Sequence, residues 1–466
     1  MKTFSTPRLY GFNIRRRERG ITLIFVVVAI FALLGVAALA IDLVTLYVSK
    51  AEAQRVADAA ALAGAKGLID SGVTADPSNS QNDWTDACAQ ASAQAQGVAA
   101  QGRIGGSPPP PGNVTITFGS GGALGAACPN SGTPGTGFGV NPEIGVTVRS
   151  AALPLFLAKI WGQRTSTVSA TALAEGFNPS GTNVPVAARC VAPWLLANID
   201  PGKTFPTPGA ITRIMRIANG QIRSPGPTPT GIIGQRISLQ AGCAGTANCA
   251  AVNPPISGPG PAPPPPPPPA FMTYYPINLG TPAASGPSCS LLGWSNYMQN
   301  IAACNPTPIA CGSTVTLETV VYPDGPSNQN AINCQINASA PGPGNGQDTL
   351  NPGFPASIAA GAANPLATSG AITTGDVISS SRSIVTIPIY DSNPGNTTVR
   401  VAPSSTVVVT GFAQAFVESV SPGAQGLGGG RPQITILNVS GCRNGATGTP
   451  VGTNAASSVP VRLIHP

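Results

Sequence analysis

The chain has 466 residues, of which 56 are glycine, 50 are proline and only 9 % are charged. This composition is too apolar for charge-rich disorder and too rich in glycine and proline for one compact helical domain, so we expect small β-rich units joined by long loops. The net charge is +7, but six of the 24 basic and one of the 17 acidic residues precede residue 20, which leaves 18 against 16. The nearly neutral remainder has no electrostatic footprint for nucleic acid, and nucleic-acid binding is not expected.

Residues 1–20 form a short basic tail, and an apolar run without any charged residue follows, from Ile21 to Ile41. A transmembrane helix of that length spans roughly 31 Å, close to the hydrocarbon thickness of a bilayer. Because the basic residues precede the span, the positive-inside rule predicts a single-pass protein with a cytoplasmic N-terminus and its bulk outside. A cleaved signal peptide is the alternative, since Ala38-Leu39-Ala40 fits a cleavage site, but the run is longer than a signal core of ~7–15 residues.

The helix is predicted to continue beyond the membrane as an alanine-rich stalk over residues 42–69, because no proline interrupts this stretch. Small residues recur on one of its faces at helical spacing, which suits close packing against a helix or backbone. A plain stalk, favoured by the helix propensity of alanine, is the alternative. The candidate packing stripe, for contact with a partner or with the exported domain, is Ala53, Ala57, Ala60, Ala61 and Gly64.

The N-terminal stretch up to Ala65 carries a recognisable pattern. A basic tail and one span ending in Ala40-Ile41-Asp42 precede Leu46-Tyr47 and the run AQRVADAAALAGA, residues 53–65. This pattern resembles TadG-like proteins of the Flp-pilus (tight adherence, Tad) assembly systems of bacteria, and residues 144–175 show a second, weaker similarity. The resemblance implies a bacterial inner-membrane anchor, a periplasmic domain, other pilus-assembly proteins as partners and a part in pilus biogenesis. It implies no known catalytic site.

The junction Gly20-Ile21 is similar to a prepilin peptidase site, in which a hydrophobic helix follows a glycine. A pilin-like chain carries glutamate at the fifth position after the cut, whereas this chain has Phe25. We therefore expect an accessory role in pilus assembly rather than a filament subunit.

All ten cysteines lie on the predicted outer side of the membrane, where an even number predicts disulfides. A zinc site is the rival interpretation, but no Cys-x-x-Cys occurs and the only histidine is His465. Spacing makes three pairs candidates without fixing the connectivity: Cys88/Cys128, Cys243/Cys249 and Cys304/Cys311. The other candidate disulfide cysteines are Cys190, Cys289, Cys334 and Cys442.

A first exported α+β unit is predicted over residues 70–178. Its helix candidate is residues 84–101, and alternating apolar residues predict strands over 114–118, 144–149 and 165–175. Between the last two strands, an apolar face made by Leu153, Phe156, Leu157 and Ile160 predicts a short helix over residues 153–161.

A second, β-rich exported unit is predicted over residues 179–466, with strands over 314–322, 383–390, 406–416 and 433–439. Proline- and glycine-rich linkers are expected at 254–270, which includes a polyproline stretch, and at 340–375. The predicted fold class is therefore α+β: one N-terminal transmembrane helix continuing into a stalk, then a β-rich exported region with long Gly/Pro loops.

The segment from Ala197 to Thr204 resembles the end of a phosphate-binding P-loop through its Gly-Lys203-Thr204. That motif requires glycine where Ala197 stands and a helix after it, whereas prolines follow closely. Neither nucleotide binding nor any other cofactor is expected.

Catalytic and metal motifs are also missing from the sequence. His465 is one residue from the C-terminus, no Gly-x-Ser-x-Gly elbow occurs, and no aspartate begins the Asp-x-Ser-x-Ser pattern of a von Willebrand-type metal site, which a few TadG-like relatives carry. The leading hypothesis is a non-catalytic, membrane-anchored component that assembles or anchors a Flp-type pilus. An envelope or surface adhesin is the alternative, and a secreted hydrolase the third.

Overall fold

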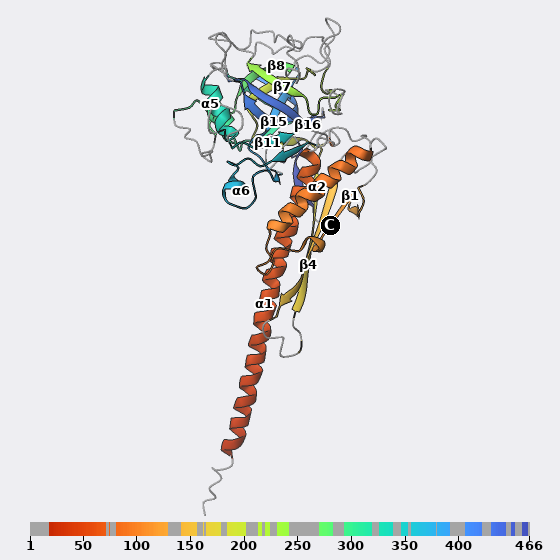
Figure 1. The fold of residues 1–466 in the computed structure, drawn as a ribbon, viewed down its shortest axis with the longest axis vertical. Coiled ribbons are helices and arrows are strands. Elements are labelled where there is room, and N and C mark those ends of the chain that lie inside the picture. The colour runs from red at the N-terminus through yellow and green to blue at the C-terminus, as the bar shows by residue number, and fades with distance from the viewer. Residues whose placement is uncertain are drawn as a thin grey trace, which may run out of the picture.

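A computed structural model describes the parts of the chain on which the fold rests (Figure 1). The described residues are 18–70, 74, 81–128, 141–155, 162, 165–178, 184–201, 213–216, 220–223, 231–241, 270–282, 293–318, 326–338, 346–352, 356–378, 380–391, 406–421, 430–443, 449–452 and 459–464.

Helix α1, Glu18–Asp70, is 53 residues long, which corresponds to about 80 Å. Within the described residues it is the one helix long and apolar enough to cross a membrane. Most of its large apolar side chains between Ile21 and Val48 are exposed on the protein itself, whereas beyond Ala53 one side of the helix is buried. These features confirm the predicted apolar N-terminal helix and its long continuation.

Helix α2, Gln81–Gln101, packs against the upper half of α1 and confirms the predicted second helix. Gly64 of α1 lies beside Ala91 and Ala95, while Val56 lies beside Gly102, just after α2 ends. The two helices therefore run in opposite directions.

A five-stranded antiparallel sheet covers these two helices. Its strands are β1 (Val114–Ser120), β2 (Ala123–Gly125), β3 (Glu143–Pro154), β4 (Thr165–Gly176) and β18 (Val461–Ile464), in the order β18-β4-β3-β1-β2. Alternate residues of β3 and β4 are buried in one core with α1 and α2, because side chains on one face of a strand recur every second residue. The first unit was predicted to end at residue 178. Its sheet nevertheless includes β18, which comes from the end of the predicted second unit.

The short helix predicted over residues 153–161 does not begin where expected. Leu153 and Pro154 lie in β3, where they pair with Ser166 and Thr165 after a bulge. Leu153 and Leu155 are both buried, so this apolar run also follows the two-residue period of a strand, which periodicity alone cannot distinguish from a short helix. Residues 156–161 lie outside the described residues.

The second unit is built on a closed ring of strands, which we call the barrel. Around the ring each strand pairs with the next in the order β15-β14-β6-β8-β7-β16, and β16 returns to β15. A further strand, β10, bridges β15 and β8. The β14–β6 and β7–β8 pairs are parallel and the others antiparallel. The strands are β6 (Trp194–Ala197), β7 (Arg236–Ala241), β8 (Ala270–Asn278), β10 (Thr314–Leu317), β14 (Ile384–Tyr390), β15 (Thr406–Val420) and β16 (Pro432–Gly441).

Part of the range predicted as a linker, 340–375, is folded. It contains β11 (Thr349–Asn351), β12 (Ser357–Ala359) and α6 (Pro365–Thr368), and β13 (Val377–Ile378) completes a three-stranded sheet. Ile358 and Ile378 of this sheet pack on Phe416 of the barrel, so a few isoleucines provide a small core within a Gly/Pro-rich stretch. Of the other predicted linker, 254–270, only Ala270 lies within the described residues.

The remaining described elements are short. They are the 3-10 turn η2 (Pro111–Asn113), the helices α4 (Asn296–Ala302) and α5 (Pro326–Gln335), and a second three-stranded sheet of β5 (Val186–Ala188), β9 (Ile309–Ala310) and β17 (Val451–Gly452).

Disulfide bonds cross-link residues within each of the two units. Of the candidate pairs, Cys88–Cys128 is formed, whereas Cys304 and Cys311 each bond to another cysteine, so that candidate pair is wrong. Hydrogen bonds from Gly312 to Val409 and from Cys442 to Thr410 bring residues 311 and 442 together on β15, so tertiary pairing decides the connectivity rather than chain spacing. Cys334 is also disulfide-bonded, whereas Cys243, Cys249 and Cys289 lie outside the described residues. The observed pairs are Cys88–Cys128, Cys190–Cys304 and Cys311–Cys442.

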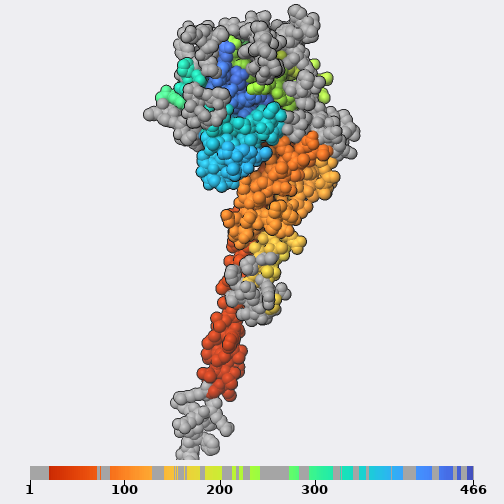
Figure 2. All heavy atoms as spheres, in the orientation of Figure 1, coloured from red at the N-terminus to blue at the C-terminus, as the bar shows by residue number. Residues whose placement is uncertain are grey.

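The assembled molecule is elongated (Figures 1 and 2). The N-terminal part of α1 projects away from the rest of the described fold, the five-stranded sheet and α2 lie beside its upper half, and the barrel lies beyond them. The helix that carries the predicted membrane span is therefore also the helix on which the rest of the fold is mounted.

The hydrophobic core of the barrel unit holds two tyrosines whose rings meet edge to face. Tyr275 and Tyr390 are buried, with ring centroids 6.1 Å apart. Burial raises the pKa of Tyr275 to about 12. Burial, with smaller effects from Tyr275 and Asp391, raises the pKa of Tyr390 well above its usual 10.0.

These tyrosines predict an alkaline loss of stability. Unfolded tyrosines ionise near pH ~10, so the stabilisation is complete below that pH and is lost as the pH rises through the folded pKa of about 12. Tyr390→Phe removes one of the two groups, and the stability lost between about pH 8 and about pH 11, measured by chemical unfolding of the full chain, is expected to shrink. Tyr47→Phe, on the exposed side of α1, is the matched control. An equal alkaline loss in Tyr390→Phe and the unmodified protein would contradict the prediction.

Candidate functional site

The candidate site is the surface through which α1 holds the rest of the protein. It has two parts: the predicted packing stripe on the side of the helix, and a set of polar contacts at its C-terminal end. We call the second part the polar joint, and define it as Ile69, Asp70 and Thr74 with Gln414 and Asn438.

The structure places all five stripe residues in the interior. The four alanines have no exposed surface, and Gly64 is buried with them. Their neighbours are α2 on one side and the apolar face of β3 and β4 on the other. Of the alternatives left open by the sequence, the stripe therefore contacts the protein's own folded domain.

Small side chains are required here because the elements approach so closely. A Cβ added at Gly64 would lie 2.4 Å from Cδ1 of Ile144 and 3.3 Å from both the carbonyl oxygen of Ala91 and Cβ of Ala95. Ile144 is itself fully buried in the shared core and has little room to move. Position 64 thus needs glycine for the approach of its neighbours, although glycine lowers helix propensity.

This packing predicts opposite effects for the same substitution on the two helices. Gly64→Ala is expected to destabilise the full chain by about 1–2 kcal/mol, because overpacking outweighs the gain in helix propensity. Gly97→Ala in α2 meets no atom within 4 Å and is expected to stabilise by about 1 kcal/mol. Thermal unfolding of the two variants in detergent micelles measures the difference, and equal shifts of the same sign would show that position 64 is not tightly packed.

Polar residues of α1 also cover part of the open edge of β4. β18 pairs with β4 only from Leu173 to Gly176, so the earlier part of this edge has no neighbouring strand among the described residues. The side chains of Lys50 and Gln54 donate hydrogen bonds to the carbonyl oxygens of Ser169 and Thr171 on that edge. A covered edge cannot pair with strands of other chains.

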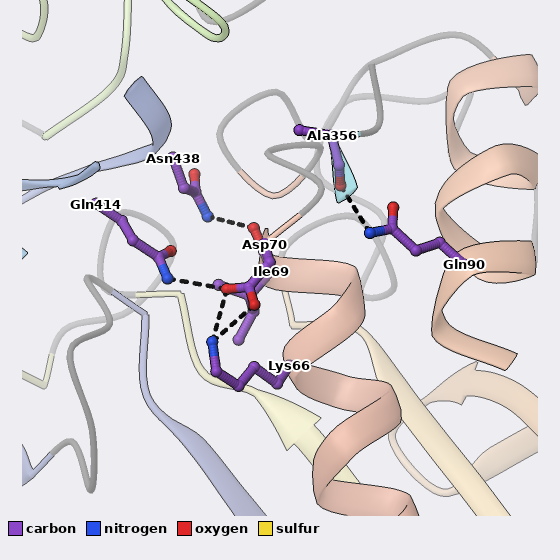
Figure 3. Close-up of polar contacts among 7 residues, drawn as sticks. All are labelled: Lys66, Ile69, Asp70, Gln90, Ala356, Gln414 and Asn438. Carbon is purple, nitrogen blue, oxygen red and sulfur yellow. Dashed lines mark hydrogen bonds and ion pairs between the residues drawn. The ribbon is translucent and has the colours of Figure 1, made fainter. Parts of the chain in front are cut away.

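At the end of α1, Asp70 forms the first half of the polar joint (Figure 3). Its carboxylate accepts hydrogen bonds from Nζ of Lys66 at 2.7 and 2.9 Å and from Nε2 of Gln414 at 2.9 Å. A negative charge at a helix C-terminus is unfavourable by itself, and these two donors offset it. Gln414 lies on β15, so this contact joins the helix directly to the barrel.

Asn438 forms the second half. Its Nδ2 donates to the carbonyl oxygen of Ile69 at 3.0 Å and to Oγ1 of Thr74 at 2.7 Å. The last carbonyls of a helix have no partner within the helix, so Asn438 caps α1 from the neighbouring strand β16. Asn438 and Gln414 are paired across β15 and β16, and both are fully buried.

A third contact joins α2 to the barrel side of the molecule. Nε2 of Gln90 donates to the carbonyl oxygen of Ala356, just before β12, at 2.7 Å (Figure 3). Near the joint, Nδ2 of Asn178 donates to the carbonyl oxygen of Thr74 at 2.7 Å. Both helices and the segment just after β4 therefore contribute polar contacts around the end of α1.

The polar joint is not among the residues expected from the sequence, although the sequence contains a signal for it. Gln414 and Asn438 are amides within strands that are otherwise almost wholly apolar, in the runs GFAQAFV and TILNV. Buried amides require hydrogen-bond partners, so a polar residue in such a run indicates a specific contact.

Within the described ranges, no group of three or more histidine, cysteine, aspartate or glutamate side chains is placed to hold a metal ion. Ala197 ends strand β6, whereas Lys203, Thr204 and His465 lie outside the described residues.

Residues 20–67 match the family model for Tad, described as Flp pilus-assembly TadE/G-like. The match includes the apolar span and the whole packing stripe, and it confirms the resemblance to TadG-like proteins over this segment. The weaker resemblance over residues 144–175 lies outside the matched residues. No curated protein and no solved structure matches the chain. The match supports membrane association and involvement in Flp pilus assembly.

Proposed function

We propose that this protein is a non-catalytic, membrane-anchored component that assembles or anchors a Flp-type pilus. The observation that carries the proposal is the family match over residues 20–67, the segment that forms both the apolar span and the core of the domain beyond it. Its partners are other pilus-assembly proteins.

The architecture supports a positioning role. One uninterrupted helix leads from the apolar span to the polar joint, and the distance from Ile41 to Asp70 along it is about 44 Å. Because the stripe packs on one side of this helix and the polar joint holds its C-terminal end, the barrel is held at a set height above the membrane. A rigid mount of this kind suits a protein that presents a domain to an assembly machine.

The proposed location is the bacterial inner membrane, with residues 1–20 in the cytoplasm and the bulk in the periplasm. The excess of basic residues before the span supports this orientation. The disulfides of both units fit an oxidising compartment. Protease treatment of spheroplasts tests it: the barrel should become accessible while a tag on residue 1 stays protected, and the reverse pattern would contradict the orientation.

The assembly role is tested in a deletion strain of the source bacterium. We expect electron microscopy to show loss of surface pili, and complementation with the full-length protein to restore them. Complementation with a chain lacking residues 1–41 is the matched control for the anchor and should fail. Normal pili in the deletion strain would contradict the proposal, and recovery of the exported part at the cell surface would then favour an adhesin.

A further inference from the structure

The exposed apolar surface of α1 does not end where the predicted span ends. Beyond Asp42, four large side chains remain exposed: Leu43, Val44, Tyr47 and Val48, of which Tyr47 is 78 % exposed. Their spacing puts all four on one side of the helix. Protein surfaces in water rarely expose a continuous apolar patch, so we expect another molecule to cover this side of the helix.

The opposite side of the same turns is covered by the protein itself. Ala38, Asp42 and Ser49 are buried, and they recur at helical spacing on the side away from Tyr47. The protein's own fold therefore reaches down α1 to the level of the predicted span, on one side only. The apolar side and the covered side lie at the same height.

We propose that the apolar side from Leu43 to Val48 lies in the outer headgroup layer of the bilayer, with Tyr47 as an interfacial anchor. The part of the helix from Ile21 to Val48 is about 42 Å long. That exceeds the hydrocarbon core of about 30 Å by about 12 Å, and this excess lies beyond Ile41, on the outer side, where the headgroup region begins. Tyrosine is enriched at this level because its ring is apolar and its hydroxyl is polar.

The residues around this turn agree with lipid as the occupant. Thr45 donates its hydroxyl to the carbonyl oxygen of Ile41 at 2.9 Å, which satisfies it without water. The apolar side is continuous with the exposed side of the span and ends at Lys50, after which exposed Arg55 begins a polar surface. A stable protein interface takes roughly 20–30 residues from each partner, whereas this side offers four. Lipid therefore fits better than a second copy.

Cysteine labelling of the full-length protein in phosphatidylcholine/phosphatidylglycerol vesicles tests this inference, which rests on insertion of α1. We compare Tyr47→Cys with Val36→Cys inside the span and Arg55→Cys above it, using a membrane-impermeant maleimide without reductant so that native disulfides stay closed. Tyr47→Cys is expected to react at least tenfold more slowly than Arg55→Cys, and Val36→Cys not at all. All three positions are exposed on the helix, so the fold should be kept, as protease resistance will check.

The outcomes separate the inference from its premise. If Tyr47→Cys reacts as fast as Arg55→Cys while Val36→Cys stays protected, the anchor is inserted but the headgroup contact is overturned. If Val36→Cys also reacts, insertion itself fails. If protection of Tyr47→Cys disappears when lipid is increased relative to protein, or if oxidation links two chains through it, a second copy covers this side and the lipid assignment is overturned.

Discussion

Asn438→Leu is expected to loosen the barrel from α1 and to destabilise the full chain by about 3–5 kcal/mol. The substitution keeps the branching at Cγ but leaves the carbonyl oxygen of Ile69, the hydroxyl of Thr74 and the N–H of Val439 without the partner that Asn438 provides. Each buried polar group left unsatisfied costs about 1–3 kcal/mol. Thermal unfolding in detergent micelles measures the loss, and proteinase K should cleave faster between Asp70 and Gln81.

The matched control for this variant is Asn351→Leu. Asn351 is an exposed strand asparagine in β11, so the same chemical change there should alter stability by less than about 0.5 kcal/mol. Equal effects of the two variants, or unchanged cleavage in Asn438→Leu, would show that the polar joint does not hold the barrel on the helix.

Ala57→Leu combined with Ala60→Leu is expected to disrupt the packing stripe, with a loss of about 2–6 kcal/mol. Both alanines are fully buried between α2 and the five-stranded sheet, and each added isopropyl group forces strain that typically costs about 1–3 kcal/mol. Limited proteolysis of the full-length protein reports the loosened domain. If the stripe also serves the proposed function, complementation of pilus assembly should fail in parallel.

Ala59→Leu separates the packing effect from the side-chain change. Ala59 is exposed on the same turn of α1, so leucine there should leave both protease resistance and pilus assembly unchanged. Unchanged protease resistance and unchanged assembly in the double variant would show that the stripe is needed neither for packing of the domain nor for pilus assembly.

The helical part of the fold was predictable because its signal is local and long. The uncharged run to Ile41 and the proline-free stretch after it both fall within the 53 residues of α1. The position of the stripe also followed from helical spacing. Helical spacing could not show what packs against the stripe, because α2 and the five-stranded sheet come from later parts of the chain.

The barrel could not be predicted in the same way, because it depends on pairings between distant strands. Most of β14, β15 and β16 was visible as apolar runs, but nothing in those runs fixes the parallel pairing of β14 with β6, which lies far earlier in the chain. The partners of Cys304 and Cys311 follow from such pairings, which explains why the nearest spacing gave the wrong bond. In the stretch 340–375, the high content of glycine and proline led to the prediction of a linker, although a few apolar residues around Ile358 form a small core.

The place of β18 has a consequence for the order in which the protein matures. β18 pairs with β4, although the whole barrel sequence lies between these two strands in the chain. Arg462 of β18 also forms an ion pair with Glu175, and its guanidinium carbon lies 4.7 Å from the centre of the Phe177 ring. During synthesis β4 is made long before its edge partner, so the first sheet stays incomplete until the whole barrel sequence has been made. The anchored domain is thereby finished last, and a chain truncated before residue 461 would present an open strand edge at the membrane.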